Sequence, residues 1–222
     1  MTGEEILKNG RAVAGSSFWI QTIINGGLSC LETGQKLEEI LGERIHWLSP
    51  MRLDNYRQYE LRELNDFYRD ISHGFWPKDL ETPSWSGLGE GLETGALYLL
   101  DVRSHPRELR SRFTGEEAYR RKLAQTLKRT HKSLKGKGSF NEEAWMNKYY
   151  GLGQGLTFWK KFDENRGNTR LIYLNLVDDS SLADNELLTS REAWDRAYDQ
   201  VFFEILGGRS QELDRLLYYF YV

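Results

Sequence analysis

The chain has 222 residues, enough for a full hydrophobic core, and at this length one domain is expected rather than two. Its 39% hydrophobic and 28% charged residues are typical of a globular protein. No run approaches the roughly 18 consecutive apolar residues of a membrane span, and the acidic N-terminus does not resemble a signal peptide. A lone Cys30 excludes an internal disulfide, and no Cys/His cluster has zinc spacing. We therefore expect a cytoplasmic protein with no membrane partner.

The net charge of −3 conceals a strong asymmetry along the chain. The stretch from Arg103 to Lys137 holds 12 Lys or Arg against 3 Glu, which leaves 18 basic and 30 acidic residues elsewhere. Concentrated positive charge on an otherwise acidic chain is typical of a surface that faces a polyanion. The alternative is a solvated helix face, which is the commoner origin of such a charge run.

The N-terminal third is predicted to be helical. Capping residues, glycines and apolar periodicity favour helices over residues 2–10, 16–24, 34–41 and 54–74, with a brief extended segment at 45–48.

The middle of the chain predicts a hairpin and then a buried strand. Turn residues between Pro77 and Gly95 precede an apolar strand over Ala96–Arg103. Thr114 and Glu117 have capping-box spacing and predict a helix that reaches Leu134.

The remaining elements alternate between helix and strand. A helix should begin near Asn141, and the glycines at 151, 153 and 155 predict either close packing or a kink there. A strand follows over 170–177. Thr189 and Glu192 again have capping-box spacing and predict a helix that ends at Gly207 and Gly208. The tail over 216–222 fits a helix or a strand.

The buried strand ends in a pattern that can carry chemistry. Asp101 and Arg103 are two residues apart, so a strand places both side chains on the same face.

The order of these elements resembles the α/β/α core of the PD-(D/E)XK nuclease-like superfamily. More closely, the chain resembles an uncharacterised bacterial family with a Phe-Trp-Pro segment, a Pro-x-Trp-Asp-Gly turn and a Leu-Val-Glu-Ala-Lys-Ala-His strand. The matching residues are Phe75-Trp76-Pro77, Pro83, Trp85, Gly87-Leu88, His105, Glu108, Leu109, Trp145, Tyr149-Tyr150, Leu171–Leu176, Glu192 and Trp194. The resemblance covers about two thirds of the chain, from roughly Ser49 onward.

This resemblance implies a fold and a division of the chain. The fold would be a restriction-endonuclease-like α/β/α core with a central mixed sheet, formed by residues 75–222. Residues 1–74 would be a helical portion packed on that core, in one compact domain.

The resemblance also implies a Mg²⁺-dependent nuclease site, with departures. The family's Asp and Glu-x-Lys fall on Ser86, Asp101 and Arg103, and Gly151 stands where a Gln is expected. A hydroxyl replaces a carboxylate poorly as a magnesium ligand, and an arginine stays protonated, so it cannot act as a general base. The sequence therefore predicts an impaired metal site.

Other residues could restore the missing groups. Glu90 or Glu93 on the hairpin could join Asp101 as metal ligands, as could Glu60 or Glu63, and Lys122 could replace the lysine. Each has the plainer alternative of a solvated charge.

Basic residues of the helix after the strand are the candidate nucleic-acid contacts. We expect this helix to lie near the Asp101 strand, with Arg120, Arg121, Lys128 and Arg129 facing phosphates, DNA above all. His105 could bind phosphate, or it could be a capping residue.

Three functions remain open from the sequence. The first is a nuclease-like protein with an impaired site that binds nucleic acid. The second is an active Mg²⁺-dependent DNA endonuclease or exonuclease with a rearranged site. The third is a non-catalytic interaction or structural protein. A second carboxylate within about 5 Å of Asp101 would separate the first two.

Overall fold

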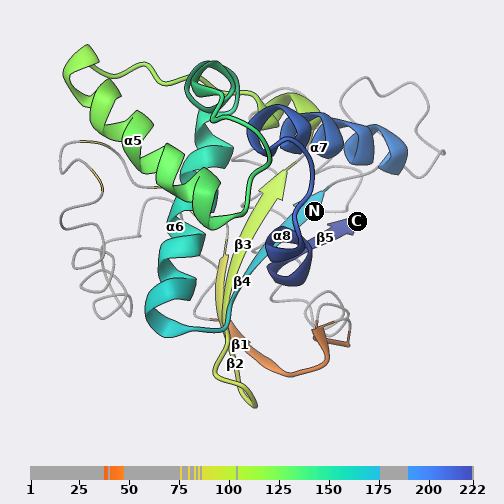
Figure 1. The fold of residues 1–222 in the computed structure, drawn as a ribbon. Coiled ribbons are helices and arrows are strands. Elements are labelled where there is room, and N and C mark those ends of the chain that lie inside the picture. Colours follow the sequence, from red (N-terminus) through yellow and green to blue (C-terminus); the bar gives the residue numbers. More distant parts are fainter. Residues whose placement is uncertain are drawn as a thin grey trace, which may run out of the picture.

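The structure is a computed structural model, and it describes residues 38–39, 41–47, 76, 80, 83, 85, 87–103, 105–175 and 190–221. A mixed sheet of five strands in the order β1-β2-β3-β4-β5 lies at its centre, with helices packed against it (Figure 1). This is the α/β class that the alternation of helical and strand patterns predicts.

Among the first three strands, each runs antiparallel to its neighbour. They are β1 (Ile45–Trp47), β2 (Gly87–Gly91) and β3 (Leu97–Arg103). The hairpin between β2 and β3 closes where the Gly91 amide donates to the Ala96 carbonyl oxygen at 2.9 Å. Gly95 in the turn has a φ of +66°, a conformation that favours glycine. The predicted hairpin and the strand that ends at Arg103 are confirmed.

The last two strands lie parallel to β3. They are β4 (Thr169–Asn175) and β5 (Leu217–Tyr221). The tail is therefore a strand, in keeping with the preference of Tyr and Phe for strands. Parallel strands need long crossover connections, and helices occupy both of the connections from β3 to β4 and from β4 to β5.

Several of the described helices pack against the sheet or against one another. They are η2 (Pro106–Leu109), α5 (Glu117–Ser133), the π-helical turn η3 (Ala144–Lys148), α6 (Tyr150–Arg166), α7 (Arg191–Leu206) and α8 (Gln211–Leu216). α6 packs on β4 and α5 packs on α6, so α5 lies further from the sheet (Figure 1).

The helix predicted from Asn141 is interrupted at Tyr149. This residue has φ −133° and ψ 36°, between the π-helical turn and α6. Ser111 pairs there, since its amide donates to Lys148 O at 2.8 Å and its carbonyl accepts from Tyr150 N at 3.0 Å. Pairing with a distant segment, rather than the glycines, therefore breaks the helix.

Both predicted capping boxes need correction. α5 begins after Glu116, which makes no side-chain capping bond, so Thr114 lies outside the helix. α7 is capped by Ser190, whose hydroxyl accepts from Ala193 N at 3.2 Å, one residue beyond the predicted Thr189. Adjacent Ser, Thr and acidic residues offer several possible caps, and packing decides among them.

Alternate residues of β3 and β4 form the main hydrophobic core with the helices. The strand residues are Leu97, Leu99, Leu171 and Tyr173, and each is 0–1% exposed. They meet apolar residues of α5, α6 and α7, among them Leu127, Trp159 and Phe202.

The opposite residues of the same strands are buried too. Tyr98, Leu100, Ile172 and Leu174 are all at most 3% exposed. Strands that are buried on both faces read as continuous apolar runs instead of alternating ones. This explains the unbroken apolar sequence that leads to Asp101.

A buried carboxylate holds the hairpin to the segment before β1. Glu43 is 8% exposed and accepts hydrogen bonds from the Tyr98 hydroxyl, the Thr94 hydroxyl at 2.8 Å and the Thr94 amide at 3.1 Å. Burial alone would raise the pKa of Glu43, but these hydrogen bonds outweigh burial and lower it. A Cβ atom at Gly91 would overlap this carboxylate, so a larger residue there would displace Glu43 from its hydrogen bonds.

Several predictions lie outside the described residues. They concern the helices over 2–10, 16–24 and 54–74, and the residues Ser86, Glu60 and Glu63. Within the 1–74 portion, the extended segment predicted at 45–48 is confirmed as β1, which pairs with β2 in the sheet. Within the part that is described, no helix has both the length and the apolar character needed to cross a bilayer.

Candidate functional site

Asp101 and Arg103 lie on one face of β3, as predicted, but they bind each other. Arg103 Nη2 lies 2.6 Å from Asp101 Oδ2, and Arg103 Nε donates to the same oxygen at 3.1 Å. Arg103 Nη1 donates to the carbonyl oxygen of Glu108 at 2.6 Å. The two side chains are only 20% and 13% exposed. The acid and the base therefore form a partly buried ion pair.

The surroundings keep Arg103 charged and fixed. Burial alone would lower the pKa of its guanidinium, but Asp101, together with Tyr198 and Tyr173, raises it above the ordinary value. The guanidinium also lies 5.6 Å from the centre of the Tyr173 ring, a cation–π distance. Arg103 can thus stabilise a negative charge, but it cannot accept a proton.

Polar and aromatic side chains pack together at the carboxyl ends of β3 and β4. The Tyr198 hydroxyl of α7 donates to Asn175 Oδ1 at 2.9 Å, and the rings of Tyr173 and Tyr198 lie 5.5 Å apart. Burial raises the pKa of Tyr173, and the Asp101 charge raises it further. Among the described residues, the side chains at this edge of the sheet therefore pack and hydrogen-bond with one another around the ion pair.

Glu90 and Glu93 lie at the wrong end of the hairpin to replace Ser86. Glu90 pairs with Leu97, four residues before Asp101, which corresponds to about 13 Å along the strand. Glu93 lies in the turn beyond it. Two ligands of one metal ion must lie within about 5 Å of each other. The prediction of Glu90 or Glu93 as a metal ligand beside Asp101 is therefore wrong.

The described residues do not fit a magnesium ion. Among them, no group of three or more His, Cys, Asp or Glu side chains is placed to hold a metal. Asp101, the carboxylate expected to bind it, is neutralised by Arg103. Ser86, Glu60 and Glu63 lie outside the described part of the chain.

His105 is a capping residue in this structure. Its Nδ1 atom accepts from Arg107 N at 3.0 Å and so caps the 3-10 helix η2. Burial lowers the pKa of His105, and the nearby Arg107 lowers it further. The alternative reading of His105 from the sequence is the one that the geometry supports.

A basic hollow runs along α5. We call it the α5 hollow: it measures about 900 Å³, and the cations that line it are Arg121, Lys128, Arg129 and Lys132. It is also lined by residues of the segment after α5, namely Gly138, Ser139, Phe140 and the acidic Glu142. Arg121, Lys128 and Lys132 follow helical spacing over about 16 Å. All four cations are exposed, and within the described residues none of them forms an ion pair.

Arg120 differs from its three predicted companions. It is half-buried, donates to Asn147 Oδ1 at 3.1 Å and lies 3.4 Å from a Glu142 oxygen. These contacts tie α5 to the π-helical turn. Arg120 is therefore a structural residue at the edge of the α5 hollow.

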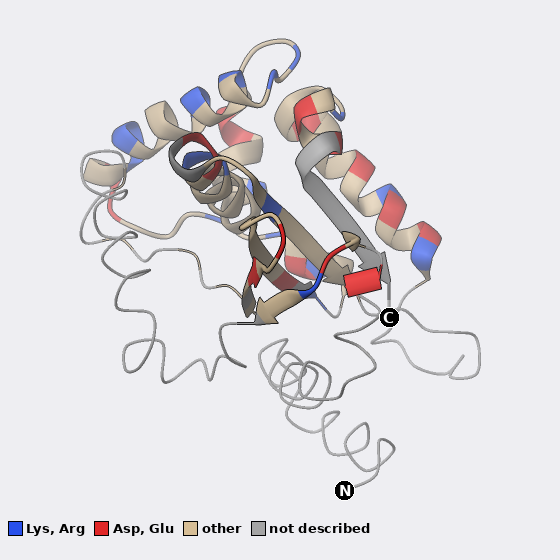
Figure 2. Ribbon diagram, turned by 90° about the horizontal axis from the view of Figure 1, so that it is seen from below, with Lys and Arg blue, Asp and Glu red and all other residues tan. Residues whose placement is uncertain are grey.

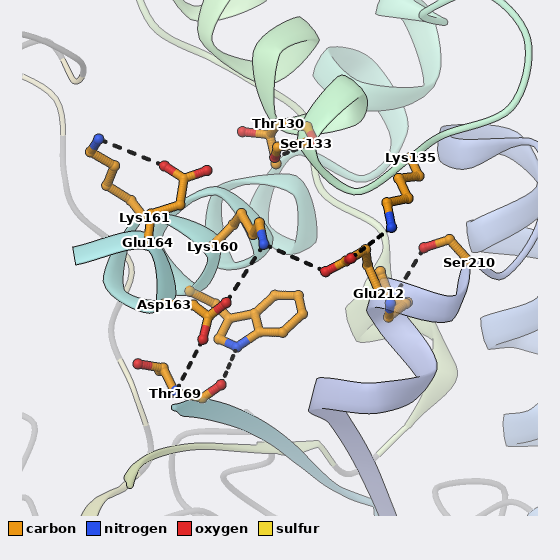
Figure 3. A network of polar contacts seen from close by, with 12 residues as sticks. Thr130, Ser133, Lys135, Lys160, Lys161, Asp163, Glu164, Thr169, Ser210 and Glu212 are labelled. Carbon is orange, nitrogen blue, oxygen red and sulfur yellow. Dashed lines mark hydrogen bonds and ion pairs between the residues drawn. The ribbon is translucent and has the colours of Figure 1, made fainter. Parts of the chain in front are cut away.

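Other lysines are neutralised by carboxylates. Figure 3 shows Lys160 between Asp163, at 3.6 Å, and Glu212, at 3.7 Å. Lys135 also pairs with Glu212, at 2.9 Å. This network joins α6 to α8. Arg129 lines a depression together with Lys160, Lys161 and Glu164, but the cations of the α5 hollow form no ion pair among the described residues.

A second hollow of about 530 Å³ lies beyond η2. Arg110 and Arg112 contribute positive charge to it, and Lys148 pairs with Glu204 at 2.8 Å. Burial and a hydrogen bond to Glu204 raise the pKa of Tyr149 to about 12, so its hydroxyl remains a donor. Arg110 and Arg112 of this second hollow belong to the basic stretch between Arg103 and Lys137.

Lys122 does not take the place of the missing lysine. It is exposed on α5, and this helix packs on α6, so no contact in the described part of the chain brings it to Asp101. The expectation that α5 lies beside the Asp101 strand is likewise corrected, because α5 packs on α6 and it is α6 that packs on β4.

Sequence reasoning missed Lys132 and Phe140. Lys132 could have been found, since it follows Lys128 by one helical turn. Phe140 could not, because only the tertiary fold brings it into the α5 hollow.

Comparison of the chain with protein-family models, curated proteins and solved structures finds no match. The residues and geometry described above therefore carry the argument for function.

Proposed function

We propose that this protein binds nucleic acid through the α5 hollow and has a nuclease-like core whose hydrolytic site is impaired. The observation that carries the proposal is the set of exposed cations that line that hollow, Arg121, Lys128, Arg129 and Lys132. A row of uncompensated cations is what a phosphate backbone binds, with release of its counterions. Figure 2 shows the blue of Lys and Arg along α5, whereas α7 also carries much red.

Two observations support the nuclease-like part of the proposal. An antiparallel hairpin is followed by parallel strands, and an acid and a base occupy one face at the end of β3. The ion pair itself supports impairment, because a metal ion would have to displace Arg103 from Asp101 Oδ2. We therefore expect little or no Mg²⁺-dependent cleavage.

The test compares charge reversal in the α5 hollow with charge reversal elsewhere. Arg121, Lys128, Arg129 and Lys132 are changed together to Glu, and fluorescence anisotropy reports the binding of labelled oligonucleotides at low salt. The matched control reverses Arg191 and Arg196, which are exposed on α7. We expect the dissociation constant to rise at least about a hundredfold in the first variant, as the loss of several phosphate contacts implies, and to change little in the control.

Two results would contradict the proposal. One is the absence of binding by the wild-type protein at low salt. The other is robust Mg²⁺-dependent cleavage that disappears in Asp101→Ala, which would make the protein an active nuclease.

A further inference from the structure

Resting on the proposed function, we infer that the α5 hollow takes a single strand of nucleic acid and that an unpaired base stacks on Phe140. The ligand class is single-stranded DNA or RNA, because both offer the same phosphates and base faces.

The position of Phe140 carries the inference. Phe140 is half-buried and lines the hollow together with the α5 cations. A positively charged groove with an aromatic side chain is the usual means of holding a single strand, because every base has a face that can stack. The bases of a duplex are already stacked on their neighbours, so an aromatic ring inside a hollow gains nothing from them.

The ring of Phe140 is held in place. It lies 5.9 Å from the Trp145 ring and 6.0 Å from the His131 ring. Trp145 is itself fixed, because its Nε1 donates to Ile205 O at 2.7 Å. The segment after α5 is anchored to the end of α7 where Lys137 N donates to Leu206 O at 2.6 Å. A rigid platform binds with a small loss of conformational entropy.

The test measures affinity of the full chain for three probes of one sequence, about 16 nucleotides long. They are single-stranded DNA, single-stranded RNA and blunt duplex DNA. We expect at least one of the single strands to bind about tenfold more tightly than the duplex. Phe140→Leu should weaken that binding about tenfold and leave duplex binding unchanged, consistent with the loss of one stacked base.

Matched variants separate stacking from folding. Phe140→Tyr keeps the stacking face and should retain wild-type affinity, and thermal melting checks that each variant is folded. Phe203→Leu removes an aromatic side chain that is 71% exposed on α7, outside the hollow, and should have no effect.

The outcomes separate this inference from the proposed function. Equal or tighter binding of the duplex, or single-strand binding that is indifferent to Phe140→Leu, overturns the inference and leaves nucleic-acid binding in place. Failure to bind any of the three probes overturns both.

Discussion

At the scale of the residue, the Asp101–Arg103 pair decides what β3 can do. Arg103 Nη2 lies 2.6 Å from Asp101 Oδ2, so the guanidinium and the carboxylate neutralise each other's charge. Arg103 also satisfies the Glu108 carbonyl, so the pair links β3 to η2. The same positions occupied by Glu and Lys would leave a carboxylate and an amine that are free to separate.

This geometry makes a prediction about stability. Arg103→Met should lower the free energy of unfolding by roughly 2–3 kcal/mol, because it leaves the partly buried Asp101 carboxylate without its partner. The double variant Asp101→Leu/Arg103→Met should be close to wild type, since replacing both partners removes the uncompensated charge. Urea unfolding of the wild type, both single variants and the double variant measures the coupling. A purely additive double variant would show that the pair does not interact in solution.

The sequence predicted where these two side chains lie, but it did not predict that they bind each other. Period-two alternation placed Asp101 and Arg103 on one face. Their mutual contact depends on the rotamers and on the Glu108 carbonyl, which a sequence pattern does not specify. The same limit applies to Glu90, because only the register of the hairpin shows that it pairs with Leu97.

At the scale of the element, the β2–β3 hairpin is stabilised by the Glu43 carboxylate. Gly91→Ala would place a Cβ on that carboxylate, so we expect a loss of roughly 1–3 kcal/mol from the displaced buried hydrogen bonds. Combined with Glu43→Ala, the same change should cost much less than the sum of the two single changes, because the clash is gone. Chemical denaturation measures the free energies of unfolding. If the losses from Gly91→Ala and Glu43→Ala simply add in the double variant, the proposed overlap with the Glu43 carboxylate is contradicted.

Local patterns predicted the elements well where local forces decide. The apolar run of β3, the periodicity of α5 and the alternation of β4 each led to the observed element. The break at Tyr149 was not predicted, because its cause is pairing with Ser111. The close packing predicted at the glycines is present, since a Cβ atom at Gly153 would lie 2.7 Å from the Trp145 ring. The tail could not be assigned, since β5 is defined by its pairing with β4.

At the scale of the whole molecule, two histidines with lowered pKa values make stability depend on pH. Burial lowers the pKa of His105 and of His131 below 6.5, and His131 Nε2 is buried with no hydrogen-bond partner among the described residues. The folded state thus resists protonation that the unfolded chain accepts.

We therefore expect the stability contributed by these histidines to be complete above pH 6.5 and to fall as the pH decreases below it. His131→Leu should reduce this slope, whereas His105→Asn should keep the cap and also reduce it. Unfolding free energies measured across this pH range check the sign. A free energy of unfolding that rises as the pH falls below 6.5 would contradict the lowered pKa values of His105 and His131.

The charge distribution of the whole molecule leads to the central claim. In the part of the chain that the structure describes, the four cations of the α5 hollow form no ion pair, while Lys135, Lys148 and Lys160 are paired with carboxylates. The asymmetry was visible in the sequence, but only the fold separates paired from unpaired lysines.

The salt dependence of oligonucleotide affinity tests this claim most directly. Between about 50 and 200 mM salt, the logarithm of the wild-type binding constant should fall linearly with the logarithm of the salt concentration. Changing Arg121, Lys128, Arg129 and Lys132 to Ala should reduce the magnitude of the slope by up to about 3, at roughly 0.7 for each phosphate contact on a single strand. An unchanged slope in this variant, or affinity that is independent of salt in the wild type, would contradict the account.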